Sequence, residues 1–428
     1  MTILLLFGTL LLCILLGVPI AISLGLSAIF TILFATDFSL TIVAQRAFTS
    51  LDSFPLLAIP FFMLAGILMG KGGVSKKLLD LASSLVGFLV GGLAMVTVVS
   101  CMFFSAISGS GPATVAAIGS FMIPEMKARN YGKGFAAAIT AASGSIGVII
   151  PPSIPFVLYG VVGSVSVGSM FLAGIIPGII LGLSLMIVSF AISKKHNYVA
   201  AQEKVSFLEV LRKVWDAKWA LLIPIIILGG IYGSIFTPTE AAVVAVVYAI
   251  IIGVFVHKEL KLKDLYQCFV EASIINGATM IIIGLSISFA YLMTLEQVPM
   301  KMADFLTGVS SNQLIILLII NIFLLIVGAF IDTISALVVL TPILLPVVTN
   351  VGVDPLHFGV ILVTNLAIGF VTPPLGVNLF VASGISGVRI ETIAKAIVPI
   401  FIMLVFSLLV ITYVPSFSTF LPEYFMGG

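Results

Sequence analysis

Two long apolar segments of this chain each contain a pair of adjacent prolines near their middle. The first pair lies in "GVIIPPSIPF", which begins at Gly147, and the second lies in "GFVTPPLGVN", which begins at Gly369. Proline removes a backbone donor, clashes with the preceding helical turn and disfavours helical geometry in the residue before it. If these segments cross a membrane, each backbone group freed at a break costs several kcal/mol in lipid. Both breaks must then face protein, water or an ion.

The composition indicates that these segments are indeed embedded in a membrane. Of the 428 residues, 61% are hydrophobic and only 8% are charged, which is too few charges to keep so much apolar surface soluble. We therefore predict an all-α polytopic membrane protein, and read residues 1–20 as a first span rather than a signal peptide because they lack a basic leading segment. The apolar runs cover residues 3–35, 51–70, 81–124, 134–162, 168–193, 219–237, 239–256, 265–295, 305–346, 356–384 and 394–414.

Three of these runs differ from a simple span. Run 3–35 is interrupted at Gly17-Val18-Pro19, so it is either one kinked span or two short ones, and the side of the N-terminus stays open. Runs 81–124 and 305–346 are about twice as long as the roughly 20 residues that a span needs. We predict that each is a helical hairpin that enters and leaves the membrane on the same side.

Lysine and arginine indicate which side each loop occupies. They concentrate around residues 71–77, 125–133, 194–218 and 257–264, and the positive-inside rule places all four loops in the cytoplasm. Within the third loop, residues 205–219 place apolar side chains mainly at three- and four-residue spacings and contain both tryptophans of the chain. This pattern predicts an amphipathic helix at the membrane surface.

The prolines reveal an internal repeat. When residues 105–177 are compared with residues 327–399, at a shift of 222, each window contains six prolines and four of them coincide without a gap. Gly147 also coincides with Gly369. The coinciding pairs are Pro124 with Pro346, Pro151 with Pro373, Pro152 with Pro374, and Pro177 with Pro399.

The charges predict that the second copy is inverted in the membrane. Between the two copies the chain crosses five times, an odd number, so basic loops of one copy should match neutral loops of the other. Loop 125–133 has three basic residues whereas 347–355 has none, and 163–172 has none whereas 385–395 has Arg389 and Lys395. An inverted-topology repeat is typical of secondary transporters.

The first hairpin has a weak point near its middle, in the segment "SAISGSGPAT" at residues 105–114. Its two glycines and its proline break the helix, and Ser105, Ser108 and Ser110 offer hydroxyl groups. Serines in membrane helices often only donate back to the helix backbone, so each of them is equally a structural residue.

The second hairpin has its weak point at "VGAFIDTISA", residues 327–336. Asp332 is the only charged residue between Asp304 and Asp354. A charge at this depth costs about 2.5–3.5 kcal/mol on insertion scales, which favours a functional role, and the alternative is a carboxylate that caps the following helix. Two hairpin tips and two broken helices related by a two-fold axis should meet at the midplane, where unwound backbone and helix ends can bind Na⁺ and anions.

The segment "GSIFTPTEAAVVAVVYAI", which begins at Gly233, resembles the signature of the large (DctM-like, M) membrane subunit of tripartite ATP-independent periplasmic (TRAP) transporters. The stretches "GSGPATVAAIGS" and "TPPLGVNLF" are similar to that family too. The resemblance implies an elevator-type, Na⁺-driven symporter for an organic acid in the bacterial inner membrane, with two or more transported Na⁺ and no organic cofactor. The acid would be a C4-dicarboxylate or sialic acid, with sialic acid preferred. The implied partners are a small membrane (Q) subunit as a separate chain and a periplasmic substrate-binding (P) protein.

The resemblance also implies the site residues. In the second half, the ion ligands fall on Gly328, Gly369 and Thr372, and in the first half on the tip with Gly147 and the break at 150–153. Since Ile150 occupies the position that matches Thr372, the first site must rely more on backbone carbonyls or on Ser153. The implied Na⁺ residues are Ser105, Ser110, Gly147, Gly328, Gly369 and Thr372, and the substrate candidates are Ser108, Ser153, Asp332 and Asn378.

Within the signature, Thr237-Pro238-Thr239-Glu240 reads as a capping box, so Glu240 is expected to be structural. An intramembrane protease is disfavoured because His196, His257 and His357 are all near loops, and an ATP-driven pump because the sequence has no phosphate-binding loop motif. The serious alternative is a stand-alone Na⁺/organic anion symporter. The net charge of +2 indicates no particular partner beyond the bilayer, and we expect no nucleic acid.

These inferences divide the chain into four parts. They are N-terminal scaffold span(s) at 1–50, repeat 1 at 51–195 with hairpin 81–124 and broken helix 134–162, an amphipathic arm and scaffold spans at 196–265, and repeat 2 at 266–428 with hairpin 305–346 and broken helix 356–384.

Overall fold

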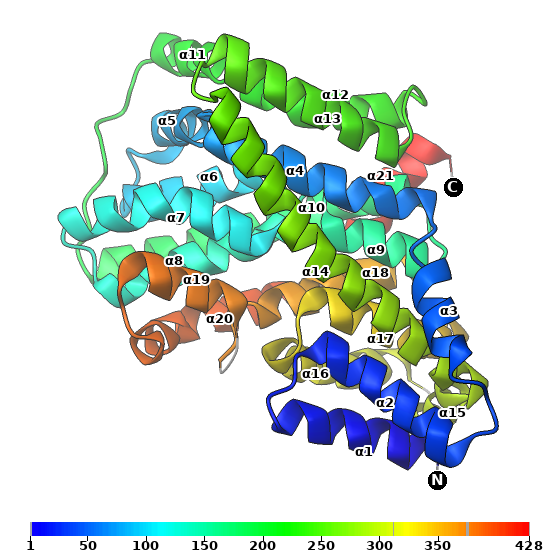
Figure 1. The fold of residues 1–428 in the computed structure, drawn as a ribbon. Helices are drawn as coiled ribbons and strands as arrows, with labels where there is room; N and C mark the ends of the chain where they lie inside the picture. Colours follow the sequence, from blue (N-terminus) through cyan, green and yellow to red (C-terminus); the bar gives the residue numbers. More distant parts are fainter. Residues whose placement is uncertain (1, 311, 374–375, 428) are drawn as a thin grey trace.

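The computed structural model describes residues 2–310, 312–373 and 376–427, and over these residues every regular element is a helix (Figure 1). Pro374, one of the prolines of the second break, lies outside the described residues. The helices of the first part of the chain are α1 (Thr2–Leu15), α2 (Ile20–Ala35), α3 (Thr41–Thr49), η1 (Phe54–Leu57), α4 (Ala58–Lys71), α5 (Val74–Val86), α6 (Gly92–Ser108), α7 (Gly111–Ala128), α8 (Lys133–Gly144), η2 (Ser145–Val148), α9 (Ile154–Val162) and α10 (Val167–Lys195).

The second part of the chain continues in the same way. Its helices are α11 (Phe207–Asp216), α12 (Lys218–Tyr232), α13 (Pro238–Ile251), η3 (Ile252–Val256), α14 (Leu262–Leu295), α15 (Val298–Val309), α16 (Gln313–Phe330), α17 (Thr333–Asn350), α18 (Pro355–Gly369), α19 (Val377–Ser386), α20 (Ile390–Tyr413) and α21 (Ser416–Met426). Among the described residues, seven helices are long and apolar enough to cross a membrane, or up to eight if the bent pair α11–α12 forms one span. The chain is therefore a multi-pass, all-helical membrane protein.

The first apolar run forms two short helices, α1 and α2, that pack against each other. Gly17 separates them with a φ of +78°, in the left-handed region that glycine adopts readily, and Pro19 directly precedes α2. The alternative of one kinked span is thereby excluded.

The amphipathic helix predicted within 205–219 is α11, which has no buried residue. Ser206 caps its first turn by accepting a hydrogen bond from the backbone N–H of Glu209 at 3.3 Å. The apolar side chains of Phe207 and Trp215 are exposed, as expected for a helix that rests on a membrane surface.

The two halves of the chain repeat one order of elements. A short helix (α5 or α15) precedes a helical pair (α6–α7 or α16–α17), then an interrupted helix (α8–α9 or α18–α19), then a long helix (α10 or α20). The first helical pair covers 92–128 rather than the expected 81–124, because α5 is a separate helix and Gly91, with a φ of +70°, ends the linker that follows it. The second covers 313–350 rather than 305–346, because α15 is a separate helix.

The two interrupted helices run in opposite directions. The hydroxyl of Tyr159, near the end of α9, donates a 2.6 Å hydrogen bond to the carbonyl of Pro355, where α18 begins. At the other end of the molecule, Lys127 at the end of α7 donates to the carbonyl of Ser386, where α19 ends. The beginning of α8 packs against α20 there, so the end of each interrupted helix lies near the beginning of the other.

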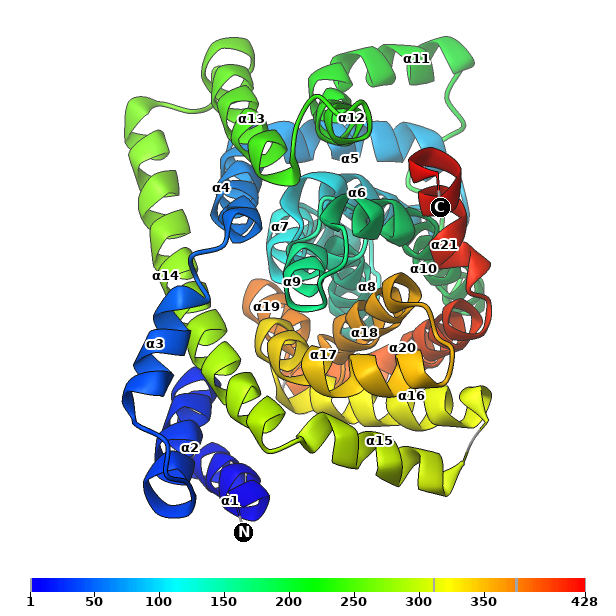
Figure 2. The ribbon, with the colours of Figure 1, turned by 90° about the vertical axis from the view of Figure 1, so that its right-hand side faces the viewer.

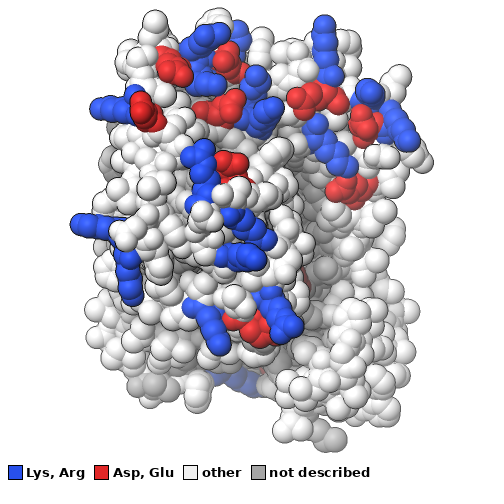
Figure 3. All heavy atoms as spheres, turned by 90° about the vertical axis from the view of Figure 1, so that its left-hand side faces the viewer, with Lys and Arg blue, Asp and Glu red and all other residues white. Residues whose placement is uncertain are grey.

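The long helix α14 organises an outer layer of the fold. It packs against α2, α3 and α4, and α4 packs against α13 in turn, so these helices lie along one side of the molecule in Figure 2. Within this layer, Lys71 at the end of α4 forms an ion pair with Glu271 of α14 at 2.6 Å. Charged side chains gather over the upper and left parts of the face drawn in Figure 3, whereas its lower right part is uncharged, as expected of lipid-facing surface.

The antiparallel arrangement predicts which exposed positions share a side of the membrane. Single cysteines at positions 132 and 395, in a background lacking Cys13, Cys101 and Cys268, should react with an impermeant thiol reagent from one side only. Cysteines at positions 164 and 350 should react only from the opposite side, because those loops lie beside the Tyr159–Pro355 contact. Labelling of all four positions from the same side would contradict this arrangement.

Candidate ion and substrate site

The tip of the first helical pair is a sharp reversal. Helix α6 ends at Ser108, Gly109 has a φ of +59°, and α7 begins at Gly111. Pro112 occupies the first turn of α7, where a missing backbone donor costs nothing. The glycines and proline that predicted a break are therefore the residues that make the turn.

This tip contacts the first interrupted helix through its backbone. A Cβ atom added to Gly147 would lie 2.6 Å from Oγ1 of Thr114 and 2.7 Å from the carbonyl oxygen of Ser110, distances that no side chain tolerates. On the other side of the turn, the backbone N–H of Ile154 donates to the carbonyl of Gly109 at 3.4 Å. Glycine at 147 thus allows the carbonyl-bearing break to touch the tip.

Three of the four predicted serines of the first half, Ser105, Ser108 and Ser153, are buried and their hydroxyls form hydrogen bonds, whereas Ser110 is half-buried. Ser105 donates to the carbonyl of Cys101 at 2.5 Å, and Ser153 donates to the carbonyl of Val148 at 2.5 Å while capping α9. Ser108 and Thr114 share a hydrogen bond of 2.8 Å. A hydroxyl whose proton is used in this way still has an oxygen lone pair for a cation.

The second half repeats the backbone contact at different residues. A Cβ atom added to Gly369 would lie 2.4 Å from the carbonyl oxygen of Gly328, at the last turn of α16. Both glycines are buried. Thr372, half-buried just after α18, donates its hydroxyl proton to the carbonyl of Ile368 at 2.9 Å, which leaves its oxygen available as well.

Asp332 is the N-cap of α17. Its Oδ1 accepts hydrogen bonds from the backbone N–H groups of Ile334 and Ser335, both at 3.0 Å, and its Oδ2 accepts from the hydroxyl of Ser335 at 2.5 Å. The carboxylate is half-buried at the second tip. The capping role foreseen as the alternative is therefore present.

Asn378 joins the two halves. It lies fully buried on α19, and its side-chain amide donates to the carbonyl of Ala141 on α8 at 3.0 Å and to Oγ of Ser145 at 3.4 Å. Its own amide oxygen is buried without a hydrogen-bond partner among the described residues. Helix α19 also packs against α7, while α9 packs against α17, so each half-helix after a break lies on the hairpin of the other half.

A buried polar chain was not anticipated from the sequence. The amide of Asn365 on α18 donates to Oδ1 of Asn321 on α16 at 2.7 Å, and the amide of Asn321 donates to Oγ1 of Thr412 at 3.1 Å. His357, expected near a loop, is buried and contacts the carbonyl of Thr412 and Oγ of Ser418, both at 3.1 Å. The presence of two asparagines in uncharged apolar runs could have indicated this chain, because side-chain amides in membrane helices form hydrogen bonds between helices.

The oxygen atoms at the two tips that could bind a cation belong to backbone carbonyls, to hydroxyl groups and to one carboxylate. The described residues contain no group of three or more His, Cys, Asp or Glu side chains arranged to hold a metal ion. The geometry thus brings together Ser108, Ser110 and Gly147 in one cluster, and Gly328 with Gly369 in a second, while Asp332 marks the second tip.

The fold resembles that of a known transporter. The solved structure of the YdaH transporter of Alcanivorax borkumensis superposes with a TM-score of 0.64, over 87% of this chain and 86% of that chain, at 14% sequence identity. The resemblance at that identity defines the architecture, a polytopic membrane protein with a transporter's fold. The particular family follows from the sequence: the model of the DctM component of tripartite ATP-independent periplasmic transporters matches residues 7–417, and the chain belongs to this family. It is a large permease component, a transporter and not an enzyme.

Relatives in this family carry several substrate names. The chain is 51% identical over 422 residues to the isethionate TRAP transporter permease protein DctMQ of Oleidesulfovibrio alaskensis, covering 99% of this chain but only 66% of that protein. It is 42% identical to a C4-dicarboxylate large permease protein of Pseudomonas aeruginosa, covering 94% of each chain. It is 37% identical to a sialic acid large permease protein of Vibrio cholerae, covering 96% of each chain.

The cap at Asp332 predicts a stability difference between two substitutions. Asp332→Ala removes the acceptor of two backbone donors and should lower the free energy of unfolding by about 0.5–2 kcal/mol, whereas Asp332→Asn keeps an acceptor oxygen and should change it little. Asp354 caps α18 in the same way, with hydrogen bonds of 2.8 and 3.0 Å, so Asp354→Ala is the matched control. Denaturation in detergent measures all three, and equal stability of Asp332→Ala and wild type would contradict the cap.

Proposed function

We propose that this chain is the transport subunit of a binding-protein-dependent system that carries an organic acid into a bacterium together with Na⁺. A periplasmic binding protein delivers the acid, and a small (Q) membrane subunit supports the large one in the inner membrane. Membership of the DctM family carries this proposal. The relative from Oleidesulfovibrio alaskensis, whose printed name joins M and Q and whose length exceeds that of this chain, supports the small subunit as a partner.

The transport mechanism we infer is alternating access by two inverted halves. Three observations support it: the repeated order of elements, the opposite directions of α8–α9 and α18–α19, and the exchange of basic and neutral loops between the halves. The layer around α14 serves as the scaffold, and the two hairpins with the interrupted helices form the moving body of an elevator. Backbone that is not helical then lies inside protein, as lipid requires.

Each half supplies one Na⁺ site in this proposal. In the first, the oxygens come from the tip residues Ser105 and Ser110 and from the backbone around Gly147. In the second, they come from the backbone at Gly328 and Gly369 and from the hydroxyl of Thr372. Close backbone approach at both places supports the assignment, because glycines let several carbonyl oxygens converge on one ion.

The acid binds between the two sites, near Ser108, Ser153, Asp332 and Asn378. An anion beside the Asp332 carboxylate requires a neighbouring cation, so Na⁺ must bind first or together with it, which couples the two fluxes. The relative named for isethionate is more similar to this chain than the relatives named for C4-dicarboxylates or sialic acid. We therefore rank a small sulfonate ahead of sialic acid, which was preferred on the family resemblance, and ahead of a C4-dicarboxylate.

Uptake by reconstituted vesicles tests the function. Vesicles with the chain and its small subunit should accumulate acid only with an inward Na⁺ gradient and the loaded binding protein. Isethionate, a C4-dicarboxylate and sialic acid are compared, each with a binding protein loaded with that acid. Uptake with K⁺ in place of Na⁺ would exclude Na⁺ coupling, and uptake without the binding protein would favour a stand-alone symporter.

The Na⁺ assignment predicts the effect of Thr372→Val. The substitution keeps the shape of the side chain and removes one oxygen, and losing one good ligand costs about 1–3 kcal/mol by analogy with an unmade buried hydrogen bond. The Na⁺ concentration for half-maximal transport should therefore rise about 5- to 150-fold. Thr372→Ser restores the oxygen and should restore the Na⁺ dependence.

Asp332→Asn serves as the comparison for this experiment. It keeps the helix cap and removes the charge, so transport should fall at every Na⁺ concentration. If Thr372→Val leaves the Na⁺ dependence unchanged while Asp332→Asn shifts it strongly, the two roles are exchanged and Asp332 is the ion ligand.

A further inference from the structure

A cleft lies away from the hairpin tips, where the beginnings of α8 and α20 meet the end of α10. Its volume is about 590 Å³, within the range of small-ligand sites. The residues that line it include Phe135, Ile192, Lys195, His196, Tyr198 and Lys395. None of them belongs to the proposed ion or substrate sites.

Two lysines from distant parts of the sequence give this cleft its charge. Lys195 is the last residue of α10, and Lys395 lies in the second turn of α20. No acidic side chain lines the cleft, and neither lysine forms an ion pair within the described part of the chain. Glu391, one helical turn before Lys395, is the nearest acid in sequence. Two uncompensated ammonium groups at one cleft favour a phosphate-sized anion.

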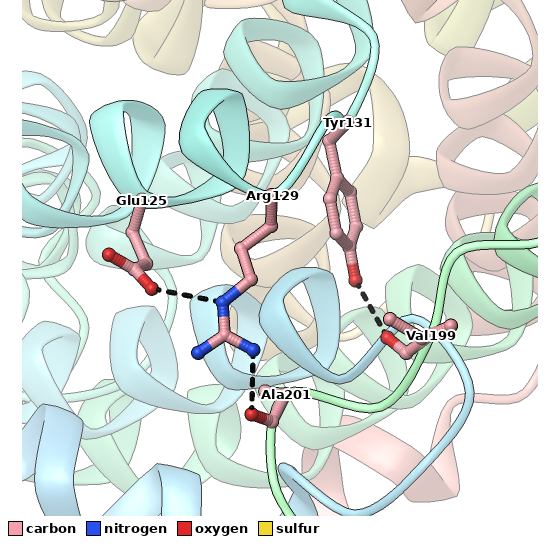
Figure 4. A network of polar contacts seen from close by, with 5 residues as sticks. All are labelled: Glu125, Arg129, Tyr131, Val199 and Ala201. Carbon is pink, nitrogen blue, oxygen red and sulfur yellow. Dashed lines mark hydrogen bonds and ion pairs between the residues drawn. The ribbon is translucent and has the colours of Figure 1, made fainter.

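The wall of the cleft is held in place by several contacts. The ring of Tyr198 stacks on that of Tyr131 at 4.2 Å and on that of His196 at 5.6 Å, and its hydroxyl accepts from the backbone N–H of Gly132 at 2.9 Å. The segment that follows Tyr198 is also held by hydrogen bonds, as Figure 4 shows. Arg129 donates to the carbonyl of Ala201 at 3.0 Å, and Tyr131 donates to the carbonyl of Val199 at 3.3 Å. The residues around Tyr198 that form one wall of the cleft are therefore held in defined positions by hydrogen bonds and ring stacking.

The cleft continues as an apolar surface along α10 and α20. Val188, Ala191 and Ile192 line one side, and Pro399 lines the other. Beyond the cleft, the side chains of Ile187 and Ile402 are about 60% exposed. In a membrane protein such a surface is in contact with acyl chains.

We propose that this cleft binds an anionic phospholipid. Lys195 and Lys395 hold the phosphate of the headgroup, and an acyl chain follows the apolar surface between α10 and α20. Basic pockets between membrane helices at the cytoplasmic side suit such headgroups, and the loops that flank this cleft are the basic ones. A bound lipid would join helices of both halves on one side of the membrane.

Native mass spectrometry of the purified chain with its small subunit tests this proposal. After exchange into detergent with added phosphatidylglycerol or phosphatidylcholine, wild type should retain phosphatidylglycerol selectively. Lys195→Gln with Lys395→Gln should weaken that binding about 25-fold, because each lysine near an anionic surface contributes about a fivefold factor. Lys76→Gln with Lys77→Gln, which removes two basic residues outside the cleft, should not weaken it. Equal retention by the two double variants would overturn the proposal.

A third variant separates a lipid from a free anion. Ala191→Trp fills the apolar wall without changing charge, so it should also reduce phosphatidylglycerol binding. Soluble glycerol phosphate should compete only weakly, because it lacks the chain. Full competition by glycerol phosphate, or unchanged lipid binding in Ala191→Trp, would show that the cleft takes a free anion and would exclude a lipid site. Na⁺-driven uptake is measured separately, so failure here leaves the transport proposal untouched.

Discussion

The central constraint on this fold is that backbone polar groups cannot remain unsatisfied in lipid. Both interrupted helices expose such groups, and both are shielded in the same way, by direct contact between a break and a hairpin tip. Gly369 lies against the carbonyl of Gly328, and Gly147 lies against the carbonyl of Ser110. A single methyl group at any of these contacts would separate the surfaces. The remaining helices are arranged so that these two contacts stay inside protein.

The two contacts belong to one centre because the halves exchange their half-helices. Helix α19 of the second half packs on α7 of the first, and α9 packs on α17. Asn378 extends this exchange with a hydrogen bond to Ala141. Packed helices thus connect the two tips directly, which is the physical connection that the proposed coupling between an ion and a substrate needs.

The structural role of polar residues in the membrane core is compatible with the ligand role that we propose for them. Ser105 and Thr372 each donate a hydrogen bond to a nearby carbonyl, which satisfies the donor and leaves the hydroxyl oxygen free, whereas the oxygen of Ser153 also accepts from the backbone N–H of Phe156. Asp332 caps a helix through its carboxylate oxygens. The same atoms that stabilise the local structure thus remain available as ligands, so a structural contact is no evidence against a functional role.

The sequence by itself determined the membrane class, the family, both helix breaks and both hairpin tips, because proline, glycine and charge act locally on the backbone and on solvation. It also identified the capping box, in which the backbone N–H of Thr237 donates to the Glu240 carboxylate at 2.8 Å. It misjudged where the hairpins begin, since α5 and α15 are apolar enough to merge with their neighbours until a turn separates them. Only the tertiary structure decided that Gly328 contacts Gly369, that Asn321 contacts Asn365, and that Lys195 and Lys395 line one cleft. Such contacts depend on how helices distant in the chain pack together, and no local pattern encodes them.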